Sequence, residues 1–334
     1  MPGFTTHYIL GVKAYQALAP GRLKFIIAKY RWLYQLGVQG PDMFFYNVPI
    51  VRHRDYRNIG SYMHEAHANS FFANAIDEIS RMDSRQKMEQ AISYIAGFMT
   101  HYIGDYICHP FVYGRIGHSP EAPSNYTHGL HAKLENDIDA IMLKKYKKKK
   151  PSEFNQAATI CLNGFETQFI SDFLSKIINI TFYPLSYKNN FQVTPGVIHR
   201  SIFALRFGCK TLADPTGKKK HGIEKLENMF LKSPIAAHKI VSDYVEDYRQ
   251  SLNLEHEVWL NPWDKSLASN QSFPELFNLS LKQCHKIFYL LNEDIKNINK
   301  EKSRIRNIRN RLFILHLLHC CGHQEVFEFL WLLL

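Results

Sequence analysis

The chain has 334 residues, of which 46% are hydrophobic and 21% are charged. This composition excludes a disordered chain and is typical of a globular protein with a sizeable core. The formal net charge of +11 favours anionic partners, namely nucleic acid, anionic lipid headgroups or phosphorylated substrates, without choosing among them. The N-terminal residues have neither region of a secretory signal, so we expect a cytoplasmic protein. The six scattered cysteines predict free thiols.

Apolar residues recur at three- and four-residue spacing along most of the chain, and this period is typical of helices. Runs that alternate apolar and polar residues are short and few. We therefore expect an all-α fold. The expected helices cover residues 13–35, 64–81, 86–107, 131–147, 152–179, 199–212, 235–253, 273–299 and 304–318.

A lysine-rich run at 144–150, followed by Pro151, is the best candidate for a boundary. Residues 1–150 would form an N-terminal metal-binding helical part, and residues 151–334 a C-terminal helical part packed on the same domain. Glutamine and glutamate interrupt the apolar tail at 312–334 and would be costly in a bilayer centre. We expect the tail to be a core helix, or a segment on a membrane surface, rather than a spanning helix.

Three ionisable side chains, His101, Asp105 and His109, recur at every fourth residue. On a helix this spacing places them on one face, because residues four apart lie about one turn above each other. Imidazole and carboxylate together suit zinc, and three such groups on one face suit more than one ion. Pro110 would close this helix just after His109.

His131 and Glu135 repeat the four-residue spacing at the start of the next expected helix. Such pairs are also common on solvated helix faces, so the pair is informative only together with the first segment. Upstream, Asp42 lies in a Gly-Pro turn that can present a carboxylate rigidly, or cap a helix. His64 opens an expected helix, and His7 lies near the N-terminus, where an unconstrained residue is usually disordered.

The order and spacing of these residues resemble the zinc-dependent phospholipase C family, whose fold is shared more distantly with zinc nucleases of the S1/P1 type. The resemblance covers roughly the first 140 residues. It implies a multi-helix domain, here with additional C-terminal helices. The matching segments are Thr6-His7, Gly40-Pro41-Asp42, His64, His101-Tyr102-Ile103-Gly104-Asp105, His109-Pro110 and Gly129-Leu130-His131-Ala132-Lys133-Leu134-Glu135.

The resemblance also implies three sets of zinc ligands. Secreted members of the family complete the third set with an N-terminal tryptophan, whereas this chain begins Met1-Pro2. We therefore expect two ions, and the third stays open. The segment between Asp105 and His109 is shorter than in the secreted enzymes, so His109 should lie on the helix. The implied sets are Asp42, His64, His101 and Asp105; His109, His131 and Glu135; and His7 with Asp105 as a bridge.

The function that the resemblance implies is that of a phospholipase C-like phosphoric diester hydrolase, which releases diacylglycerol and a phosphorylated headgroup. Asp42 is the candidate to orient or deprotonate the attacking water. Peripheral contact with an anionic membrane would fit this substrate. Two alternatives stay open: an S1/P1-type nuclease or nucleotidase acting on nucleic acid, and a metal-stabilised binding protein without turnover.

Aromatic side chains near the expected site could contact lipid or a cationic headgroup, or could belong to the core. A polar and aromatic segment at 253–262 could also contact the site, although a helix-to-loop transition explains it equally. The aromatic candidates are Phe44, Phe45, Tyr46 and Tyr62.

Overall fold

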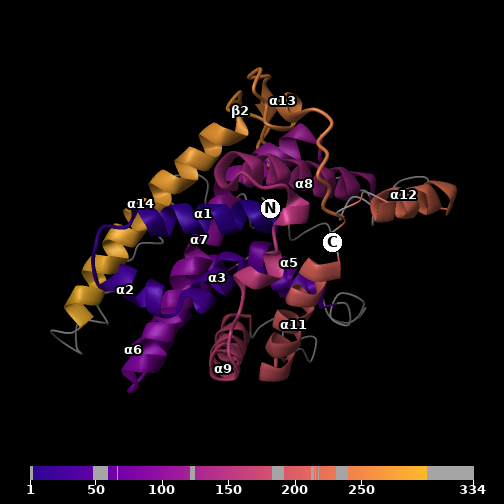
Figure 1. The fold of residues 1–334 in the computed structure, drawn as a ribbon. Helices are drawn as coiled ribbons and strands as arrows, with labels where there is room; N and C mark the ends of the chain where they lie inside the picture. Colours follow the sequence, from indigo (N-terminus) through magenta and orange to yellow (C-terminus); the bar gives the residue numbers. More distant parts are fainter. Residues whose placement is uncertain are drawn as a thin grey trace.

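The computed structural model, shown in Figure 1, describes residues 3–47, 59–65, 67–120, 125–182, 192–211, 214, 216, 218–230 and 240–298. Helices dominate these residues, so the predicted all-α fold is confirmed. Within the described ranges one short antiparallel strand pair is present, β1 (Trp259–Leu260) with β2 (Ala268–Ser269). None of the helices in these ranges combines the length and the apolar character needed to cross a membrane.

The N-terminal region is broken into short helices, so the predicted single helix over 13–35 is wrong. Pro20 and Gly21 separate the first two helices, because proline and an extended glycine do not continue a helix. Tyr30, whose φ and ψ are −115° and 44°, separates the next two. The elements are α1 (Phe4–Ala17), α2 (Arg22–Lys29), α3 (Arg31–Val38) and the 3-10 helix η1 (Gly40–Tyr46).

The long helix α7 (Arg85–Arg115) carries the three predicted ligands that recur at every fourth residue. It continues through Pro110, so the predicted stop at this proline is wrong. Phe111 and Val112, which follow the proline, are fully buried. Their packing outweighs the local cost of a missing helical hydrogen bond. His109 lies on the helix, as predicted.

Helices α3 and α7 cross at backbone contact distance. A Cβ atom on Gly37 would lie 2.1 Å from the carbonyl oxygen of Tyr94, and one on Gly97 would lie 2.1 Å from that of Tyr34. Because a Cβ fits at neither position, both residues must be glycine. This crossing fixes the end of α3, and η1 after it, against the part of α7 that carries His101.

The predicted helix over 64–81 is divided into α5 (Ile59–Glu65) and α6 (Ala68–Ser80). His67, between them, has a left-handed φ of 58°. His64 therefore lies near the end of a helix and does not open one. Helix α8 (Asn125–Lys147) begins earlier than predicted, which places His131 in its second turn.

The rest of the chain matches the predictions unevenly. The predicted helix over 152–179 is two short 3-10 turns followed by one α-helix, and the helix at 218–230 was not predicted. The predicted helix over 235–253 is wrong over residues 240–247, which are not helical, and is helical at 248–251. The elements are η2 (Pro151–Glu153), η3 (Gln156–Thr159), α9 (Gly164–Thr181), α11 (Pro195–Thr211), α12 (Lys218–Phe230), α13 (Tyr248–Ser251) and α14 (Phe273–Ile298).

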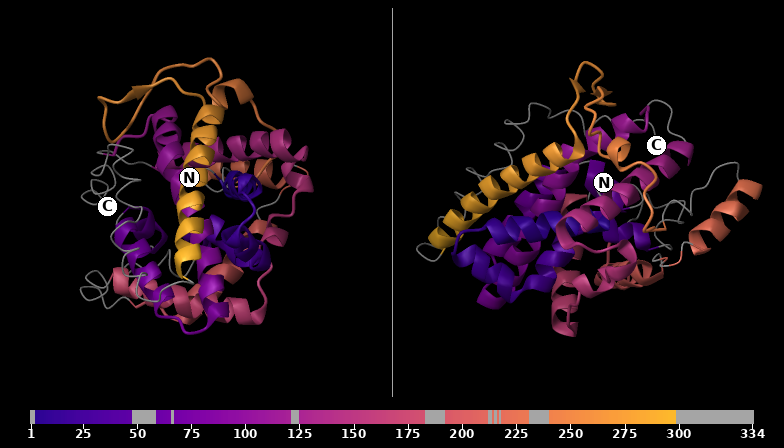
Figure 2. Two further views of the ribbon diagram at one scale, coloured as in Figure 1. Left: turned by 90° about the vertical axis from the view of Figure 1, so that its left-hand side faces the viewer. Right: turned by 45° about the horizontal axis from the view of Figure 1, so that its top comes forward.

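Helix α14 runs along one side of the molecule (Figure 2) and packs against α1, α2 and α7. Helix α11 packs against α9 and η1. Elements from beyond residue 150 thus cover those before it, while the division at residue 150 stays a prediction. The predicted helix over 304–318 and the apolar tail lie outside the described residues. The cysteines that the structure describes are free, as predicted.

Candidate metal centre

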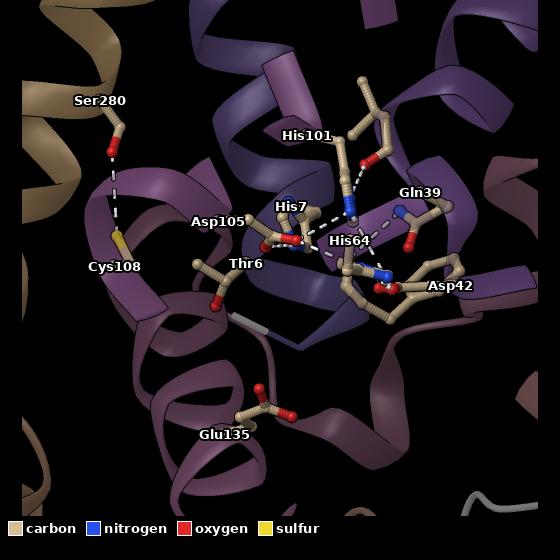
Figure 3. A network of polar contacts seen from close by, with 12 residues as sticks. Thr6, His7, Gln39, Asp42, His64, His101, Asp105, Cys108, Glu135 and Ser280 are labelled. Atoms are coloured by element: carbon tan, nitrogen blue, oxygen red, sulfur yellow. Dashed lines mark hydrogen bonds and ion pairs between the residues drawn. The ribbon is translucent and has the colours of Figure 1, made fainter. Parts of the chain in front are cut away.

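Asp105 lies at the centre of the site, on the buried face of α7 (Figure 3). One carboxylate oxygen, Oδ1, is 3.0 Å from Nε2 of His7. The other, Oδ2, is 3.0 Å from Nε2 of His101 and 3.3 Å from Nε2 of His64. The two oxygens of one carboxylate therefore face different histidines, and the side chain is positioned to serve two neighbouring ions.

Asp42 approaches the same histidines from η1. Its Oδ1 lies 3.2 Å from Nε2 of His64 and 4.0 Å from Nε2 of His101. Ligand atoms of these three residues all lie within 4.8 Å of one another, and the same holds for His7, His101 and Asp105. Since His101 belongs to both groups, these sites are contiguous.

A third group lies beside them, between α7 and α8. Ligand atoms of His109, His131 and Glu135 lie within 4.8 Å of one another. Nε2 of His131 is 2.6 Å from Oε1 of Glu135, across the single turn of α8 that separates them. The ring of His109 lies 6.4 Å from that of His64, so this third group adjoins the other two.

Backbone carbonyls orient two of the histidines. Nδ1 of His101 donates to the carbonyl oxygen of Val38 over 3.2 Å, and Nδ1 of His64 donates to that of Gly60 over 2.6 Å. A carbonyl can only accept, so each bond leaves Nε2 as the ring atom that faces the site. Metal-binding histidines are usually fixed by such outer hydrogen bonds. For His101 the close α3–α7 crossing supplies the carbonyl.

Several ligand atoms are buried and have no hydrogen-bond partner. These are Nε2 of His7, His64, His101 and His109, Oδ1 of Asp42, and both carboxylate oxygens of Asp105. Such atoms are costly to bury unless something binds them. Ligands 2.0–2.1 Å from a tetrahedral zinc ion lie roughly 3.3 Å apart, close to the separations found here. The donor set of imidazole and carboxylate therefore fits zinc.

Burial and local charge shift the pKa values in the site. Burial lowers the pKa of His101 and of His109, which favours their neutral, metal-binding forms. Burial alone would also lower the pKa of His64, but Asp105 and Asp42 raise it to about 10. Burial alone would raise the pKa of Asp105, but the surrounding histidines hold it well below its usual value.

Asp139 fixes the start of the helix that carries His7. Its two carboxylate oxygens accept hydrogen bonds of 2.8 Å from the backbone N–H groups of Thr5 and Thr6. A Cβ on Gly3 would lie 2.5 Å from this carboxylate, so glycine makes room for it. Burial raises the pKa of Asp139 to about 6 although both N–H groups favour its ionised form. The residue lies one turn beyond Glu135 on α8 and joins α8 to α1.

A segment from beyond residue 250 supports His131. The ring of Tyr113 lies 4.5 Å from that of His131 and 5.1 Å from that of Trp263. Backbone contacts hold this segment in place, since a Cβ on Gly114 would lie 2.4 Å from the carbonyl oxygen of Leu260. The polar and aromatic stretch at 253–262 and the tryptophan just after it therefore lie beside the third group of ligands.

The structure brings together all eight residues predicted as ligands, and their binding of zinc stays a prediction. Sequence reasoning missed Asp139, the carbonyl of Val38 and the Tyr113–Trp263 contact. Only Asp139 leaves a signal in the sequence, because it extends the four-residue spacing of His131 and Glu135 by one more step. The other two depend on contacts between distant segments.

The comparison with known families agrees with this geometry. The model of the family described as zinc dependent phospholipase C matches residues 6–183, which is more than half of the chain. No curated protein and no solved structure matches the chain. The matched range contains every one of the eight predicted ligands. The chain belongs to the zinc-dependent phospholipase C family.

Proposed function

We propose that the chain hydrolyses a phosphodiester bond of a phospholipid at this centre, with water as the nucleophile. The observation that carries the proposal is the position of Asp105, whose two oxygens lie 3.0 Å from Nε2 of two separate buried histidines, His7 and His101. A carboxylate placed between adjoining ligand sets suits a cluster of ions, and such clusters are suited to phosphodiesters. The match to the phospholipase C family supports a lipid substrate.

Zinc, when bound, supplies a nucleophilic water near neutral pH and relieves negative charge on the phosphoryl oxygens. The protein residues position the reactants. Asp42, which is 6% exposed, would orient the water and accept its proton through the carboxylate. A small pocket lies at the site, where candidate ligands and apolar side chains share the lining. The pocket is lined by Pro41, Met63, His64, Phe98, His101, Tyr102, Asp105 and His109.

We propose two ions as the working set. Asp42, His64, His101 and one oxygen of Asp105 would hold the first, and His109, His131 and Glu135 the second. His7 with the other oxygen of Asp105 offers a third position. We assign two protein ligands to that position, His7 and Asp105. Residues 1 and 2 lie outside the described residues.

Of the aromatic residues considered for substrate contact, Phe45 is the best candidate. Its ring is 40% exposed and stacks on His64 at 5.5 Å between centroids. Phe44 and Tyr62 are buried and belong to the core. Tyr46 packs against Gly208 of α11, at a distance that leaves no room for a Cβ. Phe45 would therefore contact the part of the lipid next to the phosphate.

The test combines zinc counting with hydrolysis assays. Native mass spectrometry should find at least two zinc ions per chain, and the loaded protein should hydrolyse phosphatidylcholine or an anionic phospholipid. Asp42→Asn should lower the rate by at least about a hundredfold. Hydrolysis of single-stranded nucleic acid and of neither lipid would refute the proposed lipid substrate and identify the protein as a nuclease. Full zinc loading without hydrolysis of any of these substrates would identify a binding protein. A protein that binds no zinc would refute both the phospholipase and the nuclease hypotheses.

A further inference from the structure

Helix α11 has two faces of different character. Its inner face is buried and packs against α9 and η1. Its outer face carries Phe203 and Phe207, which are 68% and 58% exposed. Their rings stack on each other, 6.4 Å apart and 13° from parallel. Two adjacent aromatic rings on the solvent side of a helix form an exposed apolar patch, which is a candidate contact site.

The residues around these rings are basic. Arg200 and Lys210 are exposed and lie three residues before Phe203 and three after Phe207, so all four side chains share one helix face. The sequence of α11 contains no aspartate or glutamate. Aromatic residues flanked by cations on one helix face are the pattern that binds the surface of an anionic bilayer.

Helix α11 packs beside the candidate metal centre. The helix packs directly on η1, the element that carries Asp42 and the exposed ring of Phe45. Nδ2 of Asn47, just after η1, donates to Oγ of Ser201 over 2.9 Å. Figure 1 shows α11 beside α9, and α5, which carries His64, packs on the same element η1.

We propose that the outer face of α11, formed by Arg200, Phe203, Phe207 and Lys210, docks the enzyme on anionic phospholipid membranes. The two rings would insert among the acyl chains near the headgroups, while the two cations contact lipid phosphates. The inference rests on the proposed function, because it gives a lipid hydrolase a surface that holds it at its substrate.

The test is co-sedimentation of the zinc-loaded full chain with lipid vesicles. Vesicles of phosphatidylcholine with a minority of phosphatidylserine should bind the protein more tightly than phosphatidylcholine alone. The double variant Phe203→Ala/Phe207→Ala should weaken binding by about tenfold for each ring. Arg200→Gln/Lys210→Gln should weaken binding to the anionic vesicles by about fivefold for each charge, and this loss should shrink at high salt.

Phe25→Ala is the matched control, because Phe25 is 56% exposed on α2, far from α11 in the view of Figure 1, and the cations that flank it, Arg22 and Lys29, are ion-paired with Glu89. It should leave vesicle binding unchanged. An equal loss of binding in this control would overturn the proposal, as would full binding by the double phenylalanine variant. All variants are first required to keep the zinc content and unfolding temperature of the wild type, so that loss of binding is not loss of fold.

Two further measurements distinguish membrane docking from self-association and from lipid hydrolysis. If the wild type does not bind vesicles but forms a dimer that the double phenylalanine variant abolishes, the face is a self-association surface and the proposal is wrong. Hydrolysis of a short-chain, water-soluble phospholipid by the wild type tests the proposed function by itself. Vesicle binding without such hydrolysis would refute the proposed function and leave the docking surface standing.

Discussion

Replacement of Asp105 by asparagine is the sharpest test of the metal centre. The substitution keeps the shape of the side chain but removes the charge that faces His7 on one side and His64 and His101 on the other. Because the carboxylate is positioned between two sets of ligands, its loss should weaken both. At free zinc that fills the His7 position as well as the working set, we expect Asp105→Asn to lose two zinc ions, one from each set that its oxygens face.

The expected size of the effect follows from linkage. An ion present at a thousand times its dissociation constant stabilises the folded protein by about 4.1 kcal/mol. With a shift of about 2 °C for each kcal/mol, loss of one ion would lower the unfolding temperature by roughly 8 °C. Loss of two would lower it by roughly twice that amount. Glu135→Gln is the matched control, because Glu135 belongs to one group of ligands, and it should lose a single ion.

The assay is native mass spectrometry at fixed free zinc, followed by thermal unfolding of the same samples. Circular dichroism of the metal-free variants confirms that each one folds. If the wild type holds three ions and Asp105→Asn loses one or none, or no more than Glu135→Gln loses, the bridging position of Asp105 is refuted.

Three further predictions concern the residues that support the centre. Asp139→Ala leaves two N–H groups at the start of α1 without their acceptor, and should cost about 1–2 kcal/mol in urea unfolding; an unchanged midpoint would contradict this. Gly97→Ala places a Cβ 2.1 Å from a backbone oxygen of α3, and should destabilise the fold by about 3 kcal/mol, whereas an alanine at Gly222, where a Cβ meets nothing within 4 Å, should be tolerated. His64 must lose its proton to bind zinc, and its pKa is raised to about 10 in the metal-free protein; zinc affinity should therefore rise with pH up to that value, by up to about tenfold per pH unit, and calorimetry that shows no proton release near neutral pH would refute this.

The same shift affects the stability of the metal-free protein. Because the folded-state pKa of His64 lies above its ordinary value of 6.5, the contribution of its protonated form is fully present below that value. It is lost as the pH rises towards about 10. The titration of His64 should therefore lower the unfolding midpoint of the metal-free protein as the pH rises from about 6.5 to about 10. The zinc-loaded protein should not show this pH-dependent decrease.

Five of the eight candidate ligands could be found from the sequence because they follow a helical period, whereas Asp42, His64 and His7 were singled out by the resemblance to the family. His101, Asp105 and His109 share one helix, and His131 and Glu135 share another, so local spacing alone places each set on one face. The spacing could not predict which of these helix faces lie next to each other in the folded protein. That depends on the α3–α7 crossing, where Gly37 and Gly97 permit contact between backbones, and a glycine in a sequence does not reveal what lies opposite it.

Helix boundaries were predicted less well, for reasons that differ from place to place. Periodicity continued across Pro20 and Gly21 and hid a break in the chain. At Pro110 the reverse occurred, since the buried side chains on both sides of the proline keep the helix intact. At Pro110, local propensity thus failed to predict the helix because tertiary packing was decisive. The supporting residue Trp263 could not be foreseen, because it lies far along the chain from His131.

The three candidate ligands of α7 lie on one uninterrupted helix, and this restricts insertions and deletions in that part of the sequence. Each residue turns an α-helix by about 100°, so one codon inserted between His101 and His109 would direct the downstream ligand away from its partners. The upstream end cannot compensate, because Gly97 fixes the helix against α3. We therefore expect this stretch, in which no residue from His101 to His109 is exposed, to accept no insertion or deletion.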